Sequence, residues 1–407
     1  MKSTLIAAII LTGTTAFGQQ LQFDADNYTN KEIQLSGKTI KYKAYEKIYY
    51  VGNVEDSAYQ YMNIYVPENA DGNSPIILKN YVTNYRSATA KQPNTSDITG
   101  KALGEGMVVC IAGARGSNAF SVKNVVQKKK KKSTLVDQEV IYTGKLPAPL
   151  LDLKAAVRYL KANDSQIPGN SQKIISCGSS AGGAISALLG TTANHPDYEP
   201  AISCMKAAKA NDDIYASICY SPYFIQFKED GTVDYWEEFA ADKEIRNQML
   251  KSAQKAMASG SNIPDSLGPV FFADTFISDD EQDYLVDFDT QKYARQIMKS
   301  TSGKKQIPID SLPEIKGGLA DSISISLREK MSRPFQYIND PTAIKAQNWY
   351  IHQVSLDSNA NIHITNHLAN ELKSNGLNVD MRILWSRNRQ ESDDVGNAME
   401  WIKKINN

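Results

Sequence analysis

The stretch KIISCGSSAGGAISALL, residues 173–189, decides the fold of this chain. It opens with an apolar run, passes through Gly178-Ser179-Ser180-Ala181-Gly182 and ends in small and aliphatic residues. The pattern predicts a buried strand at 173–177, a sharp turn with GxSxG spacing and a helix at 181–189. Because such a turn crowds the backbone, glycine is needed two residues on either side of the central serine.

A turn of this shape places Ser180 above the edge of a sheet. The Ala181 amide, at the start of the helix, can then donate to a developing oxyanion. The alternative is a glycine-rich turn with no chemistry.

Strands and helices alternate on both sides of this stretch. Residues 59–67 show the period of two that is typical of a strand, and residues 75–79 and 106–112 form continuous apolar runs. Continuous runs indicate strands of a parallel sheet that is covered on both faces. A helix is expected at 150–163, with Leu150, Leu153, Val157 and Leu160 on its apolar face and Lys154, Arg158 and Lys161 away from it.

The alternation resumes near the C-terminus, with strands expected at 348–354 and 380–385 and helices at about 361–373 and 394–405. Between about 222 and 341 it degrades into short helical stretches interrupted by charge clusters, Gly and Pro. We interpret that segment as an insertion in a single domain covering 19–407. The whole pattern predicts an α/β fold with a mostly parallel sheet.

Composition excludes several classes of protein. Of the 407 residues, 45 are basic and 45 acidic, and this balance argues against a dedicated nucleic-acid binder. No apolar run reaches the roughly 18 residues that a membrane span requires. The run Lys128–Lys132 is expected to be a solvated loop, with attraction to an anionic surface as the alternative.

The first 18 residues resemble a signal peptide. A basic start precedes an apolar stretch at 5–16, and small residues precede a cleavage position before Gln19. The protein is therefore expected to be exported, to a periplasm or out of the cell. Export permits disulfides among Cys110, Cys177, Cys204 and Cys219, but buried free thiols are an equal alternative.

Several motifs together resemble one family. The segments DLKAAVRYL at 152–160 and GSSAGGAISALLG at 178–190, with the strand YQYMNIYVP at 59–67, are similar to the α/β-hydrolase family of bacterial tannases and feruloyl-esterase-like enzymes. The resemblance covers most of the mature chain and is weakest in the insertion, which it implies is a lid. It implies the α/β-hydrolase fold and hydrolysis of carboxylic or phenolic esters by a serine, an aspartate and a histidine.

A nucleophilic serine needs an imidazole to take its proton and a carboxylate to orient that imidazole. Asp357 follows the strand at 348–354 and occupies the position where the family carries its acid. The alternative role for Asp357 is to cap the next helix.

The chain departs from the family at two chemical positions. Arg389 stands where the family has its catalytic histidine, in a segment that reads WSRNR at 385–389. Arginine stays protonated and cannot act as a general base. Asn359 stands where the family has an acidic residue that holds phenolic hydroxyls.

Four histidines are present. His352, on the strand before Asp357, is a possible substitute base, and His195 is expected at the surface. His363 and His367 share a helix face, but a third ligand is missing from the pattern, so the sequence predicts neither a metal site nor a cofactor.

Two functions follow. The first is an exported esterase, impaired by the loss of its histidine, that acts on a small-molecule ester. The second is an inactive homologue in which Arg389 helps to bind an anionic small molecule or glycan beside Ser180.

Overall fold

The computed structural model describes residues 21–128, 134–224, 243–263, 276–279, 284–288, 318–355, 357, 360, 362–385 and 391–406. The expected signal peptide, residues 1–18, lies outside these ranges, as do most of the lysine run and much of the insertion.

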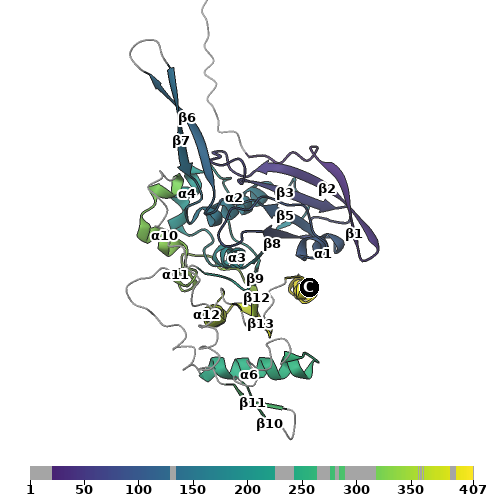
Figure 1. Ribbon diagram of the computed structural model, residues 1–407. Helices are drawn as coiled ribbons and strands as arrows, with labels where there is room; N and C mark the ends of the chain where they lie inside the picture. Colours follow the sequence, from purple (N-terminus) through teal and green to yellow (C-terminus); the bar gives the residue numbers. More distant parts are fainter. Residues whose placement is uncertain are drawn as a thin grey trace, which may run out of the picture.

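A nine-stranded sheet forms the centre of the molecule, in the order β1-β2-β3-β5-β4-β8-β9-β12-β13 (Figure 1). Strands β5 to β13 of this order run parallel, and β1, β2 and β3 are joined antiparallel at one side. The bounds are β1 Thr29–Leu35, β2 Lys38–Tyr49, β3 Tyr61–Pro67, β4 Pro75–Asn80, β5 Val108–Ala112, β8 Asn170–Ser179, β9 Ala216–Tyr220, β12 Asn348–Val354 and β13 Asn378–Leu384.

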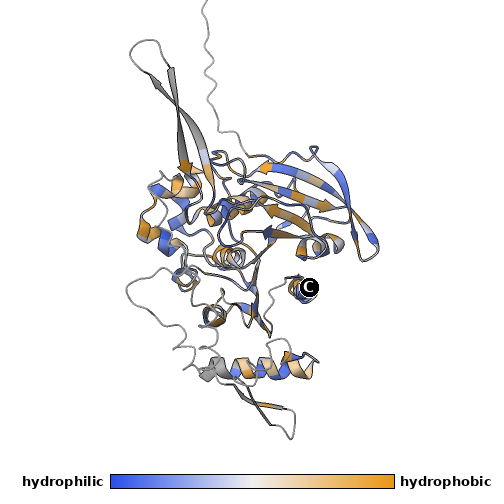
Figure 2. Ribbon diagram, in the orientation of Figure 1, coloured by the Kyte–Doolittle hydropathy of each residue, from blue (hydrophilic) through white to orange (hydrophobic). Residues whose placement is uncertain are grey.

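Helices cover both faces of the sheet. One apolar core includes residues of α2 (Ala148–Ala162), α3 (Ala181–Thr191) and α12 (Ile362–Ser374). The other core includes residues of α1 (Ile98–Gly104) and α13 (Val395–Asn406). Hydrophobic residues are concentrated in the central strands, whereas the outer strands β1 and β2 are largely hydrophilic (Figure 2).

The predicted architecture is therefore confirmed: a mostly parallel sheet flanked by helices. The expected continuous burial is seen in β5, where every residue is buried. The expected helix at 150–163 is α2, and the expected helix at 181–189 is α3.

Further elements lie outside the sheet. The hairpin β6–β7 projects from the body in Figure 1. The bounds are β6 Phe120–Lys128, β7 Thr134–Tyr142, η1 Pro196–Tyr198, α4 Glu199–Cys204, α6 Lys243–Ala258, β10 Phe276–Asp279, β11 Tyr284–Phe288, η3 Leu319–Ser322, α10 Ile325–Met331, α11 Phe335–Ile338 and η4 Glu391–Asp393.

The end of the insertion packs on the body. The Gly318 amide donates to the Tyr142 carbonyl over 2.9 Å, and the Tyr198 hydroxyl donates to the Met331 carbonyl over 2.8 Å. The extent of the insertion and its role as a lid stay predictions.

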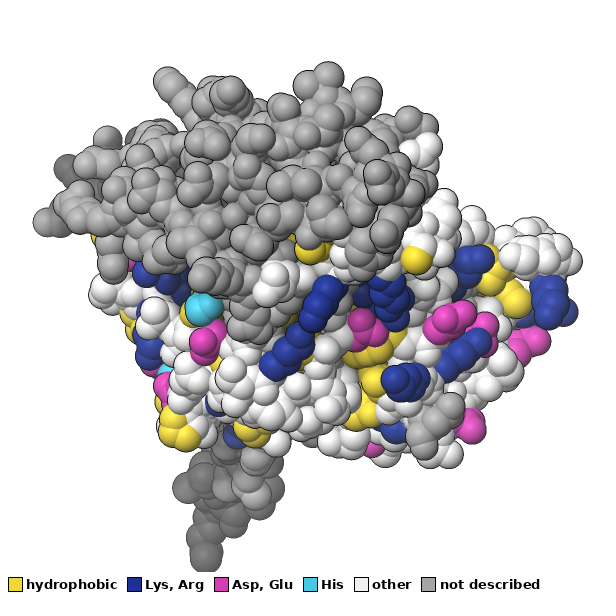
Figure 3. Space-filling view, turned by 90° about the horizontal axis from the view of Figure 1, so that it is seen from below, with side chains coloured by type: hydrophobic (Ala, Val, Ile, Leu, Met, Phe, Trp, Pro, Cys, Tyr) yellow, Lys and Arg dark blue, Asp and Glu magenta, His cyan; other side chains and the backbone are white. Residues whose placement is uncertain are grey.

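Basic and acidic side chains lie interspersed on the face shown in Figure 3. Among the described helices, none combines the length and apolarity that crossing a bilayer requires. The four cysteines are free thiols, with Cys110, Cys177 and Cys219 buried and Cys204 exposed.

The expectation that Lys154 and Arg158 point away from the core is wrong. Lys154 is fully buried and Arg158 is 7% exposed. The reason is Asp212, a buried carboxylate that lies 2.9 Å from the Lys154 ammonium and 2.8 Å from the Arg158 guanidinium. Burial raises the pKa of Asp212, but the two cations outweigh this effect, and the net result is a lowered pKa.

We predict that Asp212→Asn costs about 3–5 kcal/mol of unfolding free energy at pH 7, because it leaves two buried cations without their carboxylate. Urea denaturation of both proteins measures the difference. Since the Asp212 pKa is lowered by folding, the stabilisation is present above pH of about 4, and the gap between the proteins should shrink as the pH falls below that value.

The matched control is Glu105→Gln. Glu105 pairs with Lys403 over 2.9 Å, but both side chains are about half exposed. An exposed pair contributes about 0–1 kcal/mol, so a control as destabilising as the Asp212 variant would contradict this account of the network.

Candidate active site

The turn between β8 and α3 consists of a single residue, Ser180. Its backbone has φ 57° and ψ −123°, a conformation that non-glycine residues rarely adopt. The Ser180 amide donates to the Tyr220 carbonyl over 2.8 Å, and its carbonyl accepts from the Tyr223 amide over 3.0 Å. The strained turn is therefore held by the neighbouring strand β9 and by the segment that follows β9.

The two glycines of the motif are required by close backbone approach. A Cβ on Gly178 would lie 2.2 Å from the Gly182 carbonyl oxygen. A Cβ on Gly182 would lie 2.4 Å from Asn80 Oδ1 and 2.9 Å from the Val82 carbonyl oxygen. All three distances are shorter than those that real Cβ atoms show, which gives the sequence pattern its physical reason.

Asn80, the last residue of β4, anchors the turn from the other side. Its Nδ2 lies 3.2 Å from the Gly182 carbonyl oxygen and 3.2 Å from Ser186 Oγ, and its Oδ1 accepts from the Val82 amide over 3.3 Å. We did not predict this role from sequence. The signal in the sequence that could have indicated it is a polar residue at the carboxyl end of a buried strand, since ligands in open α/β sheets bind at those ends.

The Ala181 amide is available for an oxyanion. Ala181 is the first residue of α3, and the first amides of a helix have no acceptor within it. The Gly182 amide donates to the Val82 carbonyl over 2.9 Å, which holds the loop after β4 against the same turn.

The Ser180 side chain is enclosed. The residue is 4% exposed, and within the described part of the chain its hydroxyl makes no hydrogen bond. All four histidines of the sequence lie in that described part. None of the four imidazoles is therefore hydrogen-bonded to the Ser180 hydroxyl in this structure.

His352 lies near the end of β12, two strands from β8. Its Nε2 is 3.9 Å from Asp394 Oδ1, and its ring packs against Tyr220 with centroids 5.6 Å apart. Burial lowers the pKa of His352, with Asp394 opposing this effect. The imidazole is thus neutral at pH 7, the form that a base needs, but it faces Asp394 and Tyr220.

Asp357 follows β12 and is 8% exposed. Its Oδ1 accepts from the Ala360 amide over 3.0 Å, so one carboxylate oxygen takes part in the turn before α12. Its role as the triad acid stays a prediction. Arg389 and Asn359 lie outside the described residues.

The other histidines have structural surroundings. His195, expected at the surface, is 4% exposed, because its Nε2 lies 3.1 Å from Asp340 Oδ2 and its Nδ1 accepts from the Asp197 amide. His363 is buried, whereas His367 is exposed and stacks on Phe335. Among the described residues, no three His, Cys, Asp or Glu side chains are grouped to hold a metal.

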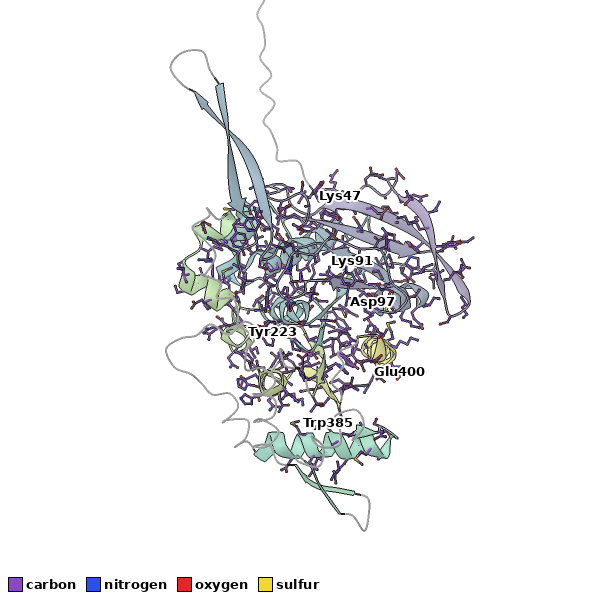
Figure 4. All side chains as sticks on the ribbon, viewed as in Figure 1. Lys47, Lys91, Asp97, Tyr223, Trp385 and Glu400 are labelled. Atoms are coloured by element: carbon purple, nitrogen blue, oxygen red, sulfur yellow. The ribbon has the colours of Figure 1, made fainter. Side chains whose placement is uncertain are left out.

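Figure 4 labels Tyr223 and Trp385, two side chains from segments that directly follow strands of the sheet. Tyr223 lies close to α3, in agreement with its amide bond to Ser180. Trp385, at the end of β13, lies beside α6, and its Nε1 donates to Ser252 Oγ over 3.3 Å. Helix α6 of the insertion is therefore in contact with the residue that follows the last strand.

Comparisons with known proteins agree with this geometry. The model of the BD-FAE family matches residues 134–226, which contain the turn at Ser180. A segment of 64 residues is 39% identical to the esterase LipC of Mycobacterium tuberculosis, but it covers 16% of each protein.

Two solved structures match nearly the whole chain. The tannase of Fusobacterium nucleatum has a TM-score of 0.72 at 24% identity, over 95% of this chain and all of that one. The tannin acyl hydrolase of Lactobacillus plantarum has a TM-score of 0.74 at 23% identity, over 95% and 99%. The chain has the α/β-hydrolase fold, and its predicted resemblance to tannases and feruloyl-esterase-like hydrolases is confirmed.

Proposed function

We propose that this protein is an exported, tannase-like serine esterase in which hydrolysis of carboxylic or phenolic esters is strongly impaired. One observation carries the proposal: Ser180 has the backbone of a nucleophile, but its hydroxyl is hydrogen-bonded to none of the four imidazoles. Export rests on the signal-like first 18 residues and stays part of the proposal.

In the proposed reaction the Ser180 oxygen attacks the ester carbonyl while a base removes its proton. The negative charge moves to the carbonyl oxygen, where the Ala181 amide donates to it. The second donor is expected in the loop after β4, because Val82 of that loop is bonded to the turn. These parts stabilise the transition state, but they do not remove the proton.

The missing step is proton transfer. Arg389, at the family's histidine position, has a guanidinium that stays charged and cannot accept the proton. His352 could replace the histidine, with Asp357 as the acid, if its ring left the contacts with Asp394 and Tyr220. Losing the base of a serine triad costs on the order of a millionfold in turnover, and about a thousandfold acceleration over water survives.

A second function is favoured by the same substitution. A permanent cation beside a serine hydroxyl and a helix N-terminus would attract an anion, since guanidinium groups bind carboxylates and sulfates in a bidentate manner. In this role the site would hold an anionic small molecule or a glycan and would release no product.

We predict that Ser180→Ala leaves the turnover of ethyl gallate, a ligand of a solved tannin acyl hydrolase, within about tenfold of wild type. The reason is that a serine without a base contributes little. Release of gallic acid, followed by chromatography, measures the rate, and Ser179→Ala is the matched control. Strong wild-type turnover that is lost in Ser180→Ala but kept in Ser179→Ala would show that another base exists.

We also predict that Arg389→His raises ethyl gallate hydrolysis by at least about tenfold, with a rate that increases as the imidazole loses its proton near pH 6.5. Arg389→Gln, which removes the charge without adding a base, should give no gain. Adding Ser180→Ala to Arg389→His should abolish the gain. Equal rates in the histidine and glutamine variants would contradict the assignment of this position.

A further inference from the structure

A cleft away from Ser180 lies between the end of β2, the last turns of α2, α4 and residues 206–211. Its volume is about 1750 Å³, and neither Ser180 nor Asp357 lines it. Pockets for single small molecules typically measure about 300–1,000 Å³, so this cleft has room for an extended ligand.

A β-bulge shapes the first wall. The pairing of β2 with β3 shifts register between Tyr45 and Ile48, where Lys47 has a φ of 58°. The Lys47 amide donates to Asn63 Oδ1 over 2.9 Å, which fixes the bulge. Bulges redirect the side chains near them, and as a result residues 45–49 all line the cleft.

Tyr49 is the aromatic group that this wall offers to a ligand. Its side chain is 37% exposed, and its ring packs edge-on against Tyr61 with centroids 6.5 Å apart. The Lys47 ammonium lies 3.6 Å from the Tyr61 ring centroid and 5.5 Å from that of Tyr49. These contacts hold an exposed, flat apolar surface in place, and such a surface suits a ligand with both apolar and polar faces.

Glu199, from α4, is the polar group of the opposite wall. Its Oε2 lies 2.7 Å from the Arg158 guanidinium, which is itself held by the buried Asp212. The Glu199 side chain is nevertheless 53% exposed. The ion pair with Arg158 already restricts the Glu199 side chain, whereas its exposed part can reach a ligand. The carboxylate can therefore accept hydrogen bonds from ligand hydroxyls with little further loss of side-chain entropy.

Strain supports a functional role for this cleft. Eight described non-glycine residues have a positive φ, and three of them, Lys47, Asn194 and Lys206, line the cleft. Residues in such conformations cost about 1–3 kcal/mol each and gather at functional sites. Of the other five, Ser180 forms the turn already described, and Ser221 directly follows β9.

From these observations we infer that the cleft binds a neutral oligosaccharide chain. The Tyr49 ring faces the C–H side of a sugar, and the Glu199 carboxylate accepts from its hydroxyls. The ionisable groups of the lining nearly balance, which disfavours an anionic polymer. They are Asp24, Glu46 and Glu199 against Lys47, Arg158, Lys206 and Lys209.

The test is affinity electrophoresis of the mature protein in native gels that contain arabinoxylan, mixed-linkage β-glucan or pullulan, with polygalacturonate as the anionic comparison. We expect retardation by at least one neutral polymer, and it should persist in 0.5 M salt, because stacking and hydrogen bonds are screened little. Ser180→Ala should be retarded like wild type, so the result is independent of any ester chemistry.

Two pairs of variants decide the location. Tyr49→Ala should weaken retardation about tenfold, whereas Tyr28→Ala, an equally exposed tyrosine that does not line the cleft, should not. Glu199→Gln should weaken it, whereas Glu400→Gln, an exposed acid on α13, should not.

No retardation by any of the three neutral polymers would overturn the inference. Equal effects of the Tyr49 and Tyr28 variants, or binding to polygalacturonate alone that salt abolishes, would overturn it as well.

Discussion

The left-handed backbone of Ser180 is the constraint on which the rest of the structure depends. Such a residue costs about 1–3 kcal/mol, and each hydrogen bond that holds it contributes about 0.5–1.5 kcal/mol. The bonds from the Ser180 amide to Tyr220, from the Tyr223 amide to Ser180 and from the Gly182 amide to Val82 are therefore of the right size to maintain it. The backbone hydrogen bonds therefore account for the Ser180 conformation, whether or not the serine is catalytic.

Those bonds come from three separate elements, which explains why the turn needs this topology. β8 lies between β4 and β9 in the sheet. Along the chain, β5, β6 and β7 come between β4 and β8, whereas β9 is the next strand after β8. Asn80 and the loop after β4 support one side, and the end of β9 supports the other. This support fixes the point at which α3 starts. The Ala181 amide, at the first residue of α3, is held in place as a result.

Local patterns predicted most of the fold, and long-range contacts explain what they missed. Apolar runs and glycine spacing depend on neighbouring residues, so β5, β8 and α3 were visible in the sequence. The burial of Lys154 depends on Asp212, which lies 58 positions away in the sequence. The periodicity of a helix contains no information about so distant a partner. The burial of His195 likewise depends on Asp340, which is 145 positions away.

The same limit applied to the candidate site. Ser180 and Ala181 were visible from a local motif, whereas the anchoring role of Asn80 required knowing that β4 lies beside β8. Arg389 was identified through resemblance to a family and lies outside the described residues, so its place beside Ser180 stays a prediction.

The Ser180 hydroxyl itself argues for a ligand. A buried hydroxyl without a partner costs about 1–3 kcal/mol, and alanine at this position would avoid that cost while keeping the backbone bonds. The described part of the chain supplies no hydrogen-bond partner for it. In the two functions proposed above, that partner is a bound molecule, either an ester carbonyl or an anion. The two kinds of ligand require different residues at the family's histidine position. Cleavage of an ester needs a neutral base there, whereas an anion is held better by a fixed positive charge. If Arg389 takes the place of the base, as proposed, the site is better suited to holding a ligand than to cleaving it.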